Sequence, residues 1–381
     1  MLEPVPGSRF TFHARVSVCN FKRSECDPFR GTIRESSVFF SKRVSFGAAI
    51  LGALAAAQLA ASPGSAATLG DVKAKGFIEC GVNHGLPGFS VSNEAGVWSG
   101  MDVDFCRGVA AAIFNDPSKV KFVPLTAQER FTALQSGEVD ILSRNTTWTM
   151  TRDTALGLSF AGVTYYDGQG FMVRRSLGIA SVLELSGTKV CTQSGTTTEM
   201  NVNDFFGSKQ IPYTLLTFAK TEQTISAYES GRCDAFSADA SQLYSARLKM
   251  KEPDTHMVLP EIISKEPLGP VVRQGDDQWF NIVKWTLFAL VNAEELGVTS
   301  QNVNDMRTSG DPDIRRLLGV DGDLGLKLGL SNNWAVNLVS AVGNYGEIFD
   351  RNVGKNSSLN IARGVNRLWN EGGILYAPPI R

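Results

Sequence analysis

The amino-acid sequence predicts an α/β protein made of two similar lobes in tandem. Short β-prone runs alternate with stretches of helical periodicity, and this alternation occurs twice along the chain. Strands that alternate with helices form parallel β-α-β units, so each lobe should contain a parallel-rich sheet flanked by helices. The residues after an N-terminal targeting segment, 68–381, are also more than one ordinary domain requires.

The first lobe is predicted from a regular succession of periodic segments. Val103, Phe105, Val109 and Ile113 recur at helical spacing, and Asn115-Asp116-Pro117 ends that helix. In chain order we expect a strand at 77–82, a loop at 83–88, the helix at 102–114, a strand at 120–124, a helix at 128–135 and a strand at 139–143.

The second lobe repeats this succession after the apolar run at 171–173. We expect a strand at 189–193, a helix after the loop at 194–199, a strand at 213–218, a helix at 222–230 and a strand at 233–237. The loop-rich stretches 249–260 and 264–270 could carry the return to the first lobe, and helices are expected from residue 279 onward, including 285–296 and 334–349. The predicted division is therefore 68–173 for the first part of lobe 1, 174–263 for lobe 2, 264–300 for the return to lobe 1, and 301–381 for a helical C-terminal extension.

The first 67 residues predict export. Lys42 and Arg43 precede an Ala-rich apolar run at 44–61, and Ser62-Pro63-Gly64-Ser65-Ala66-Ala67 follows it. A basic patch, an apolar run, a break and small residues are typical of a secretory signal peptide, with cleavage after Ala66 or Ala67. The alternative is a membrane anchor, which Gln58 and the Pro-Gly break disfavour. No cysteine stands where a lipid would be attached, so we expect a free periplasmic protein.

Charge and cysteine content narrow the functional classes. The chain has 37 basic and 38 acidic residues, whereas a nucleic-acid-binding protein needs a basic surface. Four cysteines follow the signal peptide, and in an oxidising compartment they could form two disulfides in three possible pairings. We expect Cys80 with Cys106 in the first lobe and Cys191 with Cys233 in the second; the alternative is four free buried thiols.

Polar segments follow the predicted strands, at the sheet edge where open α/β sheets bind ligands. The stretch 143–152 contains hydroxyl groups, an amide and the guanidinium groups of Arg144 and Arg152, which can bind a carboxylate. The alternative is a polar helix start that leaves Arg152 on a solvated face. The loop 194–199 opens a helix, and a helix start favours an anion; the alternative is a capping box of Thr196 with Glu199.

Asp239 follows the strand at 233–237 and could pair with an ammonium group, although an aspartate there is also a common helix cap. Two loops could bind a carboxylate, and one acid could bind an ammonium group. All three lie at equivalent strand ends of the two lobes, and together they supply what binding an α-amino acid requires. The combination therefore predicts a cleft for a polar, zwitterionic ligand.

At this point the sequence resembles the solute-binding proteins of polar amino-acid ABC transporters, which have the type 2 periplasmic-binding-protein fold. The resemblance covers about 68–381 and is closest to the general L-amino-acid subgroup, through the segments 143–148, 165–170, 231–234 and 374–379. It implies two α/β lobes that are joined by two crossing strands and close over one amino acid.

By this resemblance, Arg152 matches the arginine that binds the ligand carboxylate, and Asn145 and Thr147 match the polar residues beside it. Thr197 matches the threonine of the second lobe that binds the same carboxylate, and Asp239 matches the acid that binds the α-ammonium. Two positions depart from the narrower family members. Leu86 lies in a loop where those members carry a stacking aromatic residue, and Arg144 replaces a small hydroxyl residue. Together with Thr196, these residues form the predicted site, and both departures favour broad specificity.

The partners follow from the same comparison. No Gly-rich Lys-Ser/Thr phosphate loop occurs, so ATP hydrolysis should belong to cytoplasmic ATPases that act with a membrane permease. No Cys-x-x-Cys motif occurs, and only His84 and His256 follow the signal peptide, so we expect no metal and no cofactor. We expect a monomer that is not an enzyme. The alternatives are a dehydratase-like enzyme on the same fold, for which the motif loops supply no acid beyond Asp239, and a ligand sensor.

Overall fold

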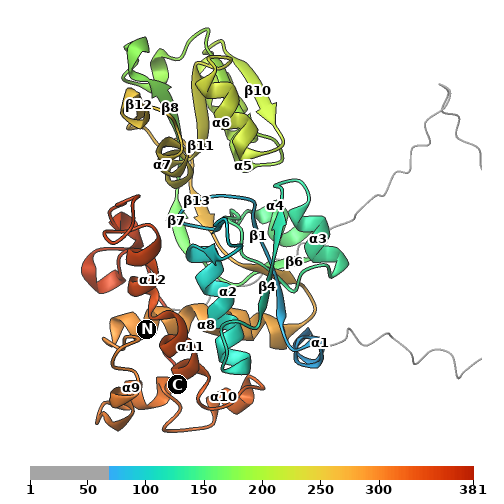
Figure 1. Cartoon of the computed structure of the whole chain (residues 1–381), viewed down its shortest axis with the longest axis vertical. Coiled ribbons are helices and arrows are strands. Elements are labelled where there is room, and N and C mark those ends of the chain that lie inside the picture. Colours follow the sequence, from blue (N-terminus) through green and yellow to red (C-terminus); the bar gives the residue numbers. More distant parts are fainter. Residues whose placement is uncertain (1–67) are drawn as a thin grey trace, which may run out of the picture. The chain divides into compact units, whose positions relative to one another are not determined.

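Two five-stranded sheets organise the computed structural model, which describes residues 68–381 (Figure 1). The predicted signal peptide lies outside the described residues. The first sheet has the order β4-β1-β5-β14-β6, with β1 Ile78–Asn83, β4 Val120–Leu125, β5 Ile141–Leu142, β6 Leu158–Phe160 and β14 Val271–Arg273. The second has the order β10-β9-β11-β8-β12, with β8 Gln169–Arg174, β9 Lys189–Gln193, β10 Thr214–Phe218, β11 Ala235–Asp239 and β12 His256–Val258.

Parallel pairs form the inner part of each sheet, as the alternation of strands and helices predicts. β1 pairs in parallel with β4 and β5, and β9 pairs in parallel with β10 and β11. The strands β14, β6, β8 and β12 add antiparallel pairs. We refer to the part built on the first sheet as lobe 1 and to the part built on the second sheet as lobe 2.

Two crossing strands connect the lobes. The chain leaves lobe 1 through β7, Tyr165–Asp167, and returns through β13, Glu266–Leu268, and these strands pair antiparallel. The strand β13 lies in the loop-rich stretch at which the sequence predicts the return. Because only this short pair continues from one sheet to the other, β7 and β13 form the hinge region of the molecule.

Helices cover both sheets. In lobe 1 these are α1 Thr68–Lys75, α2 Met101–Phe114, α3 Arg130–Ser136, α4 Met150–Ala155 and α8 Asp277–Glu295. In lobe 2 they are α5 Thr197–Lys209, α6 Thr221–Glu229 and α7 Ala240–Leu248. None of the helices within residues 68–381 is both long and apolar enough to span a membrane.

Each lobe contains one disulfide, and both expected pairings are confirmed. Cys80 of β1 is bonded to Cys106 of α2, with Cα atoms 6.4 Å apart. Cys191 of β9 is bonded to Cys233, which precedes β11, with Cα atoms 5.7 Å apart. All four residues are fully buried, so each disulfide ties a central strand to a neighbouring element of the same lobe.

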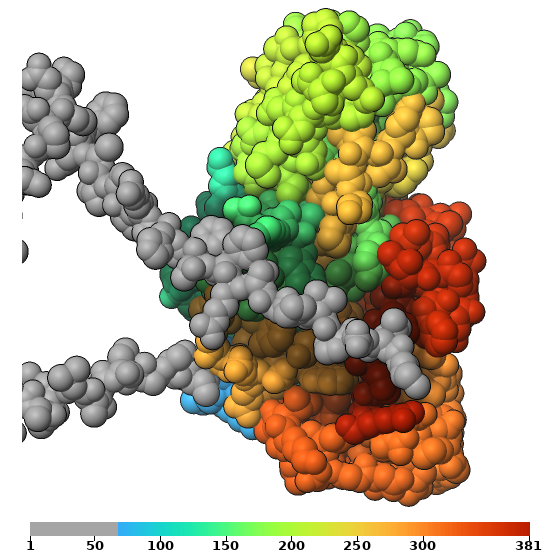
Figure 2. Space-filling view, turned by 180° about the vertical axis from the view of Figure 1, so that it is seen from behind, coloured from blue at the N-terminus to red at the C-terminus, as the bar shows by residue number. Residues whose placement is uncertain are grey.

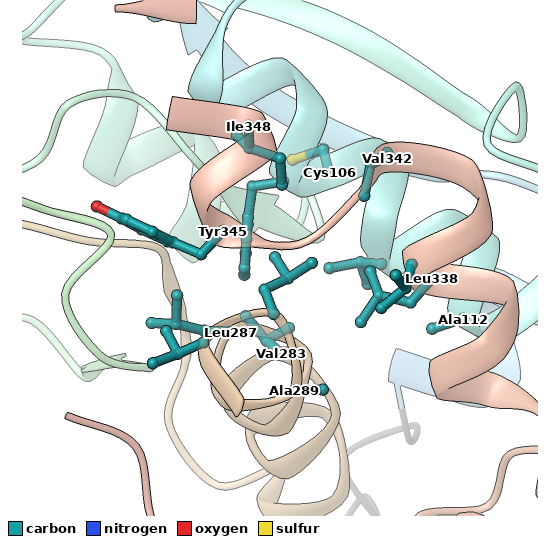
Figure 3. Close-up of a cluster of buried hydrophobic side chains, with 14 of the residues drawn as sticks. Cys106, Ala112, Val283, Leu287, Ala289, Leu338, Val342, Tyr345 and Ile348 are labelled. Atoms are coloured by element: carbon teal, nitrogen blue, oxygen red, sulfur yellow. The ribbon is translucent and has the colours of Figure 1, made fainter. Parts of the chain in front are cut away.

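The C-terminal segment packs on lobe 1 through its own helices, α9 Pro312–Leu317, α10 Leu324–Lys327, α11 Trp334–Val342 and α12 Tyr345–Asn352. Leu338 and Val342 of α11 and Ile348 of α12 lie against α2 and α8 in one buried cluster (Figure 3). In Figure 2 the orange to red surface of this segment is continuous with that of lobe 1. The segment therefore extends the core of lobe 1.

The predicted helix at 334–349 is wrong in one respect, because the structure divides it into α11 and α12. Gly343 ends α11 with a positive φ of 79°, which glycine adopts without steric cost. Asn344 then caps α12, and its capping box with Glu347 starts a new helix. The predicted strand at 139–143 is also shorter, since only Ile141–Leu142 pair as β5.

Candidate ligand-binding site

The segment after β5 carries the first group of predicted ligand-binding residues. Asp102 of α2 holds it in place, because its carboxylate accepts hydrogen bonds from the Ser143 hydroxyl at 3.1 Å and the Asn145 N–H at 2.9 Å. Asn145 has a positive φ of 34°, and its side-chain oxygen accepts a bond from Asn83. Burial raises the pKa of Asp102 to about 6, although these hydrogen bonds lower it. Asn145 is therefore fixed at the carboxyl edge of the first sheet.

Arg152 lies in the short helix α4, which Thr149 caps through its hydroxyl. The Arg152 guanidinium donates to the Thr147 carbonyl at 2.9 Å and lies 5.2 Å from the ring centre of Phe131. Only 8% of Arg152 is exposed. The alternative of a solvated arginine at a polar helix start is therefore wrong.

Thr147 lies beside the hinge strand β13. It forms an isolated β-bridge with Leu268, and the neighbouring Trp148 N–H donates to the Pro267 carbonyl at 2.8 Å. These contacts tie the segment that carries Thr147 to the strand that enters lobe 1 from lobe 2. The Thr147 hydroxyl is thereby placed at the boundary of the two lobes.

Thr196 acts mainly as a helix cap. Its hydroxyl accepts a bond from the Glu199 N–H at 3.4 Å and donates to the Gln193 carbonyl at 2.6 Å. The Glu199 carboxylate accepts a hydrogen bond from the Gly195 N–H at 3.1 Å. In a standard capping box it would accept from the N–H of the N-cap residue, Thr196, which is the next residue along the chain. The structure thus supports the capping alternative for Thr196.

Thr197 is the first residue of α5 and points toward lobe 1. Its hydroxyl oxygen lies 3.3 Å from that of Thr147, which brings the two predicted segments together across the lobes. The same hydroxyl donates to Glu266 of β13 at 2.8 Å, and Glu266 also accepts a bond from Asn201. Thr147 and Thr197 therefore mark the point at which a small ligand would contact both lobes.

Asp239 occupies the N-cap position of α7, but its side chain makes no capping hydrogen bond. It is 6% exposed. Burial raises its pKa well above the ordinary value, and the nearby charges of Asp167 and Glu266 raise it further. Asp167 of β7 accepts a bond from the Ser241 N–H of α7, and burial raises its pKa to about 6. Sequence analysis missed Asp167 and Glu266, because both lie on hinge strands rather than in the motif loops.

Arg130 is a third missed residue. It begins α3, is 3% exposed, and its buried Nε has no hydrogen-bond partner within residues 68–381. It lies 4.7 Å from the ring centre of Phe131, the ring that Arg152 also contacts. Burial and the charges of Arg152 and Arg144 lower the pKa of Arg130 well below its ordinary value. The available signal in the sequence was an arginine that directly precedes the apolar residues Phe131, Ala133 and Leu134.

The two remaining predicted residues have structural contacts. Arg144 is 2% exposed and donates from Nε to the Leu125 carbonyl at 2.8 Å, and burial lowers its pKa to about 10. Leu86 is 2% exposed and belongs to the core of lobe 1, where its backbone pairs with Ser90. Its side chain is thus packed inside lobe 1, and no aromatic ring takes its place in that loop.

Apart from Asp102, whose charge acts on Arg144 within lobe 1, the buried charges around the site are grouped by sign. Three buried guanidinium groups belong to lobe 1, whereas the three acids belong to β7, β11 and β13: Arg130, Arg144, Arg152, Asp167, Asp239 and Glu266. This arrangement matches a zwitterion, with its carboxylate toward lobe 1 and its ammonium toward the acids. In the described part of the chain, no group of His, Cys, Asp or Glu residues is arranged to hold a metal ion.

Comparison with known proteins decides the family. Residues 78–302 match the bacterial extracellular solute-binding proteins, family 3. The chain belongs to this family. Its two lobes and two hinge strands are the type 2 periplasmic-binding-protein arrangement that the sequence resemblance implied.

Close relatives cover nearly the whole chain. The general L-amino acid-binding periplasmic protein AapJ of Rhizobium johnstonii is 60% identical over 86% of this chain and 98% of its own length. The glutamate/glutamine/aspartate/asparagine-binding protein BztA of Rhodobacter capsulatus is 52% identical over 87% of this chain and 99% of its own. A solved ABC-transporter periplasmic binding protein from Brucella ovis with glutathione bound is 58% identical, covers 83% of this chain and all of its own, and superposes with a TM-score of 0.82.

Proposed function

We propose that this protein is a periplasmic receptor that binds L-amino acids with broad specificity and delivers them to an ABC permease. The observation that carries the proposal is the separation of buried arginines and acids across the Thr147–Thr197 contact. An α-amino acid has one carboxylate and one ammonium group, and it satisfies both sides of this boundary at once. The names of the close relatives point to the same class of ligand.

Each side of the site has a defined task in this proposal. Arg152 binds the ligand carboxylate, with Asn145 and the hydroxyls of Thr147 and Thr197 beside it. Asp239 binds the ammonium group. In the structure the Thr197 hydroxyl donates to Glu266, so it must reorient to donate to a ligand carboxylate.

Broad specificity follows from where the firm contacts lie. These contacts bind the carboxylate and the ammonium group, which all α-amino acids share. The Leu86 side chain is packed in the core and supplies no surface on which a ligand side chain could stack. Arg130 has unused N–H donors, which suit ligands that carry a second carboxylate. Glutathione, which is bound in the Brucella relative, has an α-amino acid head and two carboxylates, so this chemistry extends to small γ-glutamyl peptides.

The partners and location are part of the proposal. The N-terminal segment directs the chain to the periplasm, where a monomer closes over its ligand and docks on membrane permease subunits served by cytoplasmic ATPases. The expected division placed residues 68–173 and 264–300 in lobe 1, 174–263 in lobe 2 and 301–381 in the extension. Because β8, Gln169–Arg174, belongs to the second sheet, we place the end of the first part of lobe 1 at the hinge strand β7 instead. The differential affinity of the ligand for the closed form limits how far it can drive closure.

A dehydratase-like enzyme is the second candidate, and the cluster of Asp167, Asp239 and Glu266 is the observation in its favour. Buried acids with raised pKa values can act as general acids. We favour the receptor because these acids also balance the three arginines, and because the close relatives are named as binding proteins. A ligand sensor would use the same site with a different partner.

Calorimetric titration of refolded residues 68–381 against the common L-amino acids and several D-isomers tests the proposal. We expect tight binding of many L-isomers, and the ligand recovered by chromatography should be chemically unchanged. Arg152→Ala and Asp239→Ala should each abolish tight binding without lowering the melting temperature by more than a few degrees. A variant that binds as well as the parent would remove that residue from the site, and consumption of the ligand would favour the enzyme.

A further inference from the structure

A second contact joins the lobes on either side of Leu86, away from Arg152 and Asp239. The Lys249 ammonium, just after α7 in lobe 2, donates to the Gly85 carbonyl of lobe 1 at 2.6 Å. The Ser245 hydroxyl of α7 lies 2.8 Å from the Pro87 carbonyl in the same loop. We call these two interactions the loop–helix contact. Along a helix axis, Ser245 and Lys249 lie about 9 and 15 Å from Asp239 at 1.5 Å per residue.

The loop side of this contact is held rigidly. Leu86 and Ser90 exchange backbone hydrogen bonds of 2.7 and 2.8 Å, and Leu86 is buried in the core of lobe 1. Gly88 has a positive φ of 83° and lies so close to Val353 and Leu359 that an added Cβ would collide with both side chains. The C-terminal extension thus supports the loop from behind, and the carbonyls of Gly85 and Pro87 face lobe 2 in fixed positions.

The helix side is tied to the ligand site. The helix α7 starts directly after Asp239, and Asp167 of the hinge accepts a hydrogen bond from the Ser241 N–H in its first turn. A movement of α7 that brings Asp239 toward the ligand therefore also brings Lys249 toward the loop. Lys249 is the stronger donor of the pair, because the single hydroxyl hydrogen of Ser245 is shared with the Ser241 carbonyl at 2.9 Å.

We propose that the loop–helix contact adds a ligand-independent contribution to lobe closure, and that the C-terminal extension acts through Gly88 to keep its loop half in place. The inference rests on the proposed receptor function. A contact that exists only in the closed form, and that touches no ligand, multiplies the affinity for every ligand by one factor. Such a contact suits broad specificity, because it strengthens the binding of every ligand without contacting the ligand side chain.

The test compares Lys249→Met with Lys251→Met, a matched control at an exposed lysine whose side chain makes no hydrogen bond in the described structure. Affinities for L-glutamine, L-glutamate and L-alanine are measured by calorimetry. We expect Lys249→Met to weaken all three by the same factor, about threefold to tenfold for one hydrogen bond from an exposed side chain. Ser245→Ala should have a smaller uniform effect, and Lys251→Met should have none. Unchanged affinities in Lys249→Met, or factors that differ several-fold between ligands, would overturn the proposal.

A ligand-free measurement separates this inference from the receptor function. Fluorescent labels at Lys119→Cys in lobe 1 and Lys209→Cys in lobe 2, both exposed positions, report closure by single-molecule energy transfer. We expect a measurable closed fraction without ligand, and Lys249→Met should lower the closed-to-open ratio by the factor that it removes from the affinity. A parent with no closed fraction, or a ratio unchanged by the variant, would overturn the contact's role even if amino acids bind. Leu359→Ala should reproduce the uniform weakening, and unchanged affinities there would overturn the part assigned to the extension.

Discussion

Arg130 shows at the scale of one residue how this site departs from ordinary protein packing. Its Nε is buried without a hydrogen-bond acceptor among residues 68–381, and the charges of Arg152 and Arg144 act on it more strongly than that of Asp239. A buried charge without a partner is costly, because its desolvation is not compensated. A buried cation of this kind is expected where a ligand supplies the missing partner. Asp239 is in the corresponding position for an anion, because burial without an ion-pair partner among the described residues raises its pKa.

Replacing Arg130 should therefore separate stability from function. We expect Arg130→Met to raise the free energy of unfolding of the ligand-free protein by about 1–3 kcal/mol, because a buried cation whose Nε lacks an acceptor is removed. Affinity for L-glutamate should fall more than affinity for L-glutamine, since only glutamate offers a second carboxylate. Urea denaturation and calorimetry measure the two effects. Lower stability together with unchanged glutamate affinity would show that Arg130 has a structural task instead.

The raised pKa values of Asp167 and Asp239 predict pH-dependent binding. An ammonium ligand needs ionised acids, and Asp167 takes up a proton as the pH falls through about 6. Affinity for L-glutamine should therefore decrease steadily from pH 7.5 to pH 5, as calorimetry in matched buffers would measure. In Asp167→Asn this decrease should be much smaller, because the group that takes up the proton near pH 6 is absent. An affinity that is constant across this range would contradict the assigned role of the acids.

The raised pKa of Asp167 has the opposite effect on the stability of the ligand-free protein. The folded-state pKa of Asp167 lies above its ordinary value of 3.8, so the folded protein binds the proton more tightly than the unfolded chain. The stabilising contribution of this acid is fully present at low pH and is lost as the pH rises through about 6. Ligand affinity and the contribution of Asp167 to ligand-free stability should thus change in opposite directions with pH.

At the scale of elements, the C-terminal extension completes the hinge strand β7. The Asn366 side chain accepts a bond from the Tyr166 N–H at 2.7 Å and donates to the Tyr166 carbonyl at 3.0 Å. The strand β13 pairs with one edge of β7, and the Asn366 side chain supplies the hydrogen-bond partners that a second neighbouring strand would provide. Tyr345 of α12 adds a hydrogen bond to the Thr164 carbonyl at 2.8 Å. One crossing strand is thus anchored to lobe 1 by residues about 200 positions away in the chain.

Removing this anchor should destabilise the fold. Asn366→Ala leaves the N–H and C=O groups of Tyr166 without their partner, which we expect to lower the free energy of unfolding by about 1–3 kcal/mol. The matched control is Asn370→Ala at an exposed asparagine in the same segment, which should have almost no effect. Urea denaturation of both variants measures the difference. Equal stabilities would mean that water replaces the Asn366 contacts without loss.

At the scale of the whole molecule, each lobe is cross-linked by its own disulfide, and neither disulfide joins one lobe to the other. They close loops with sequence separations of 26 and 42 residues. In the chain-entropy description, loops of these lengths correspond to about 3–4 kcal/mol each. Because the bonds lie in different lobes, their contributions should be independent of each other.

Paired substitutions test this division. Cys80→Ala with Cys106→Ala, and Cys191→Ala with Cys233→Ala, should each lower the free energy of unfolding by about 3–4 kcal/mol, and their effects should add. Differential scanning calorimetry of the parent with and without a reducing agent provides the covalent control. A parent that melts at the same temperature under both conditions would contradict a stabilising role for the bonds.

Local patterns determined much of this protein from its sequence alone. Period-two and period-3.6 repetition located most strands and helices, and short polar segments at strand ends located the stretches that contain Arg152, Thr197 and Asp239. The resemblance to a family then assigned ligand contacts to these three residues. The cysteine pairs followed from placing each pair within one lobe. These features depend on neighbours in the chain, or on the topology that regular alternation implies, so they can be inferred without coordinates.

Only the tertiary structure decided which residues face the boundary of the lobes. Arg130, Asp167 and Glu266 belong to three separate segments, and no local pattern relates them. The same holds for the burial of Leu86 and for the contacts of Lys249 and Asn366, which join residues 164 and 200 positions apart. The physical reason is that desolvation and charge pairing depend on distance in space, whereas a sequence records only distance along the chain.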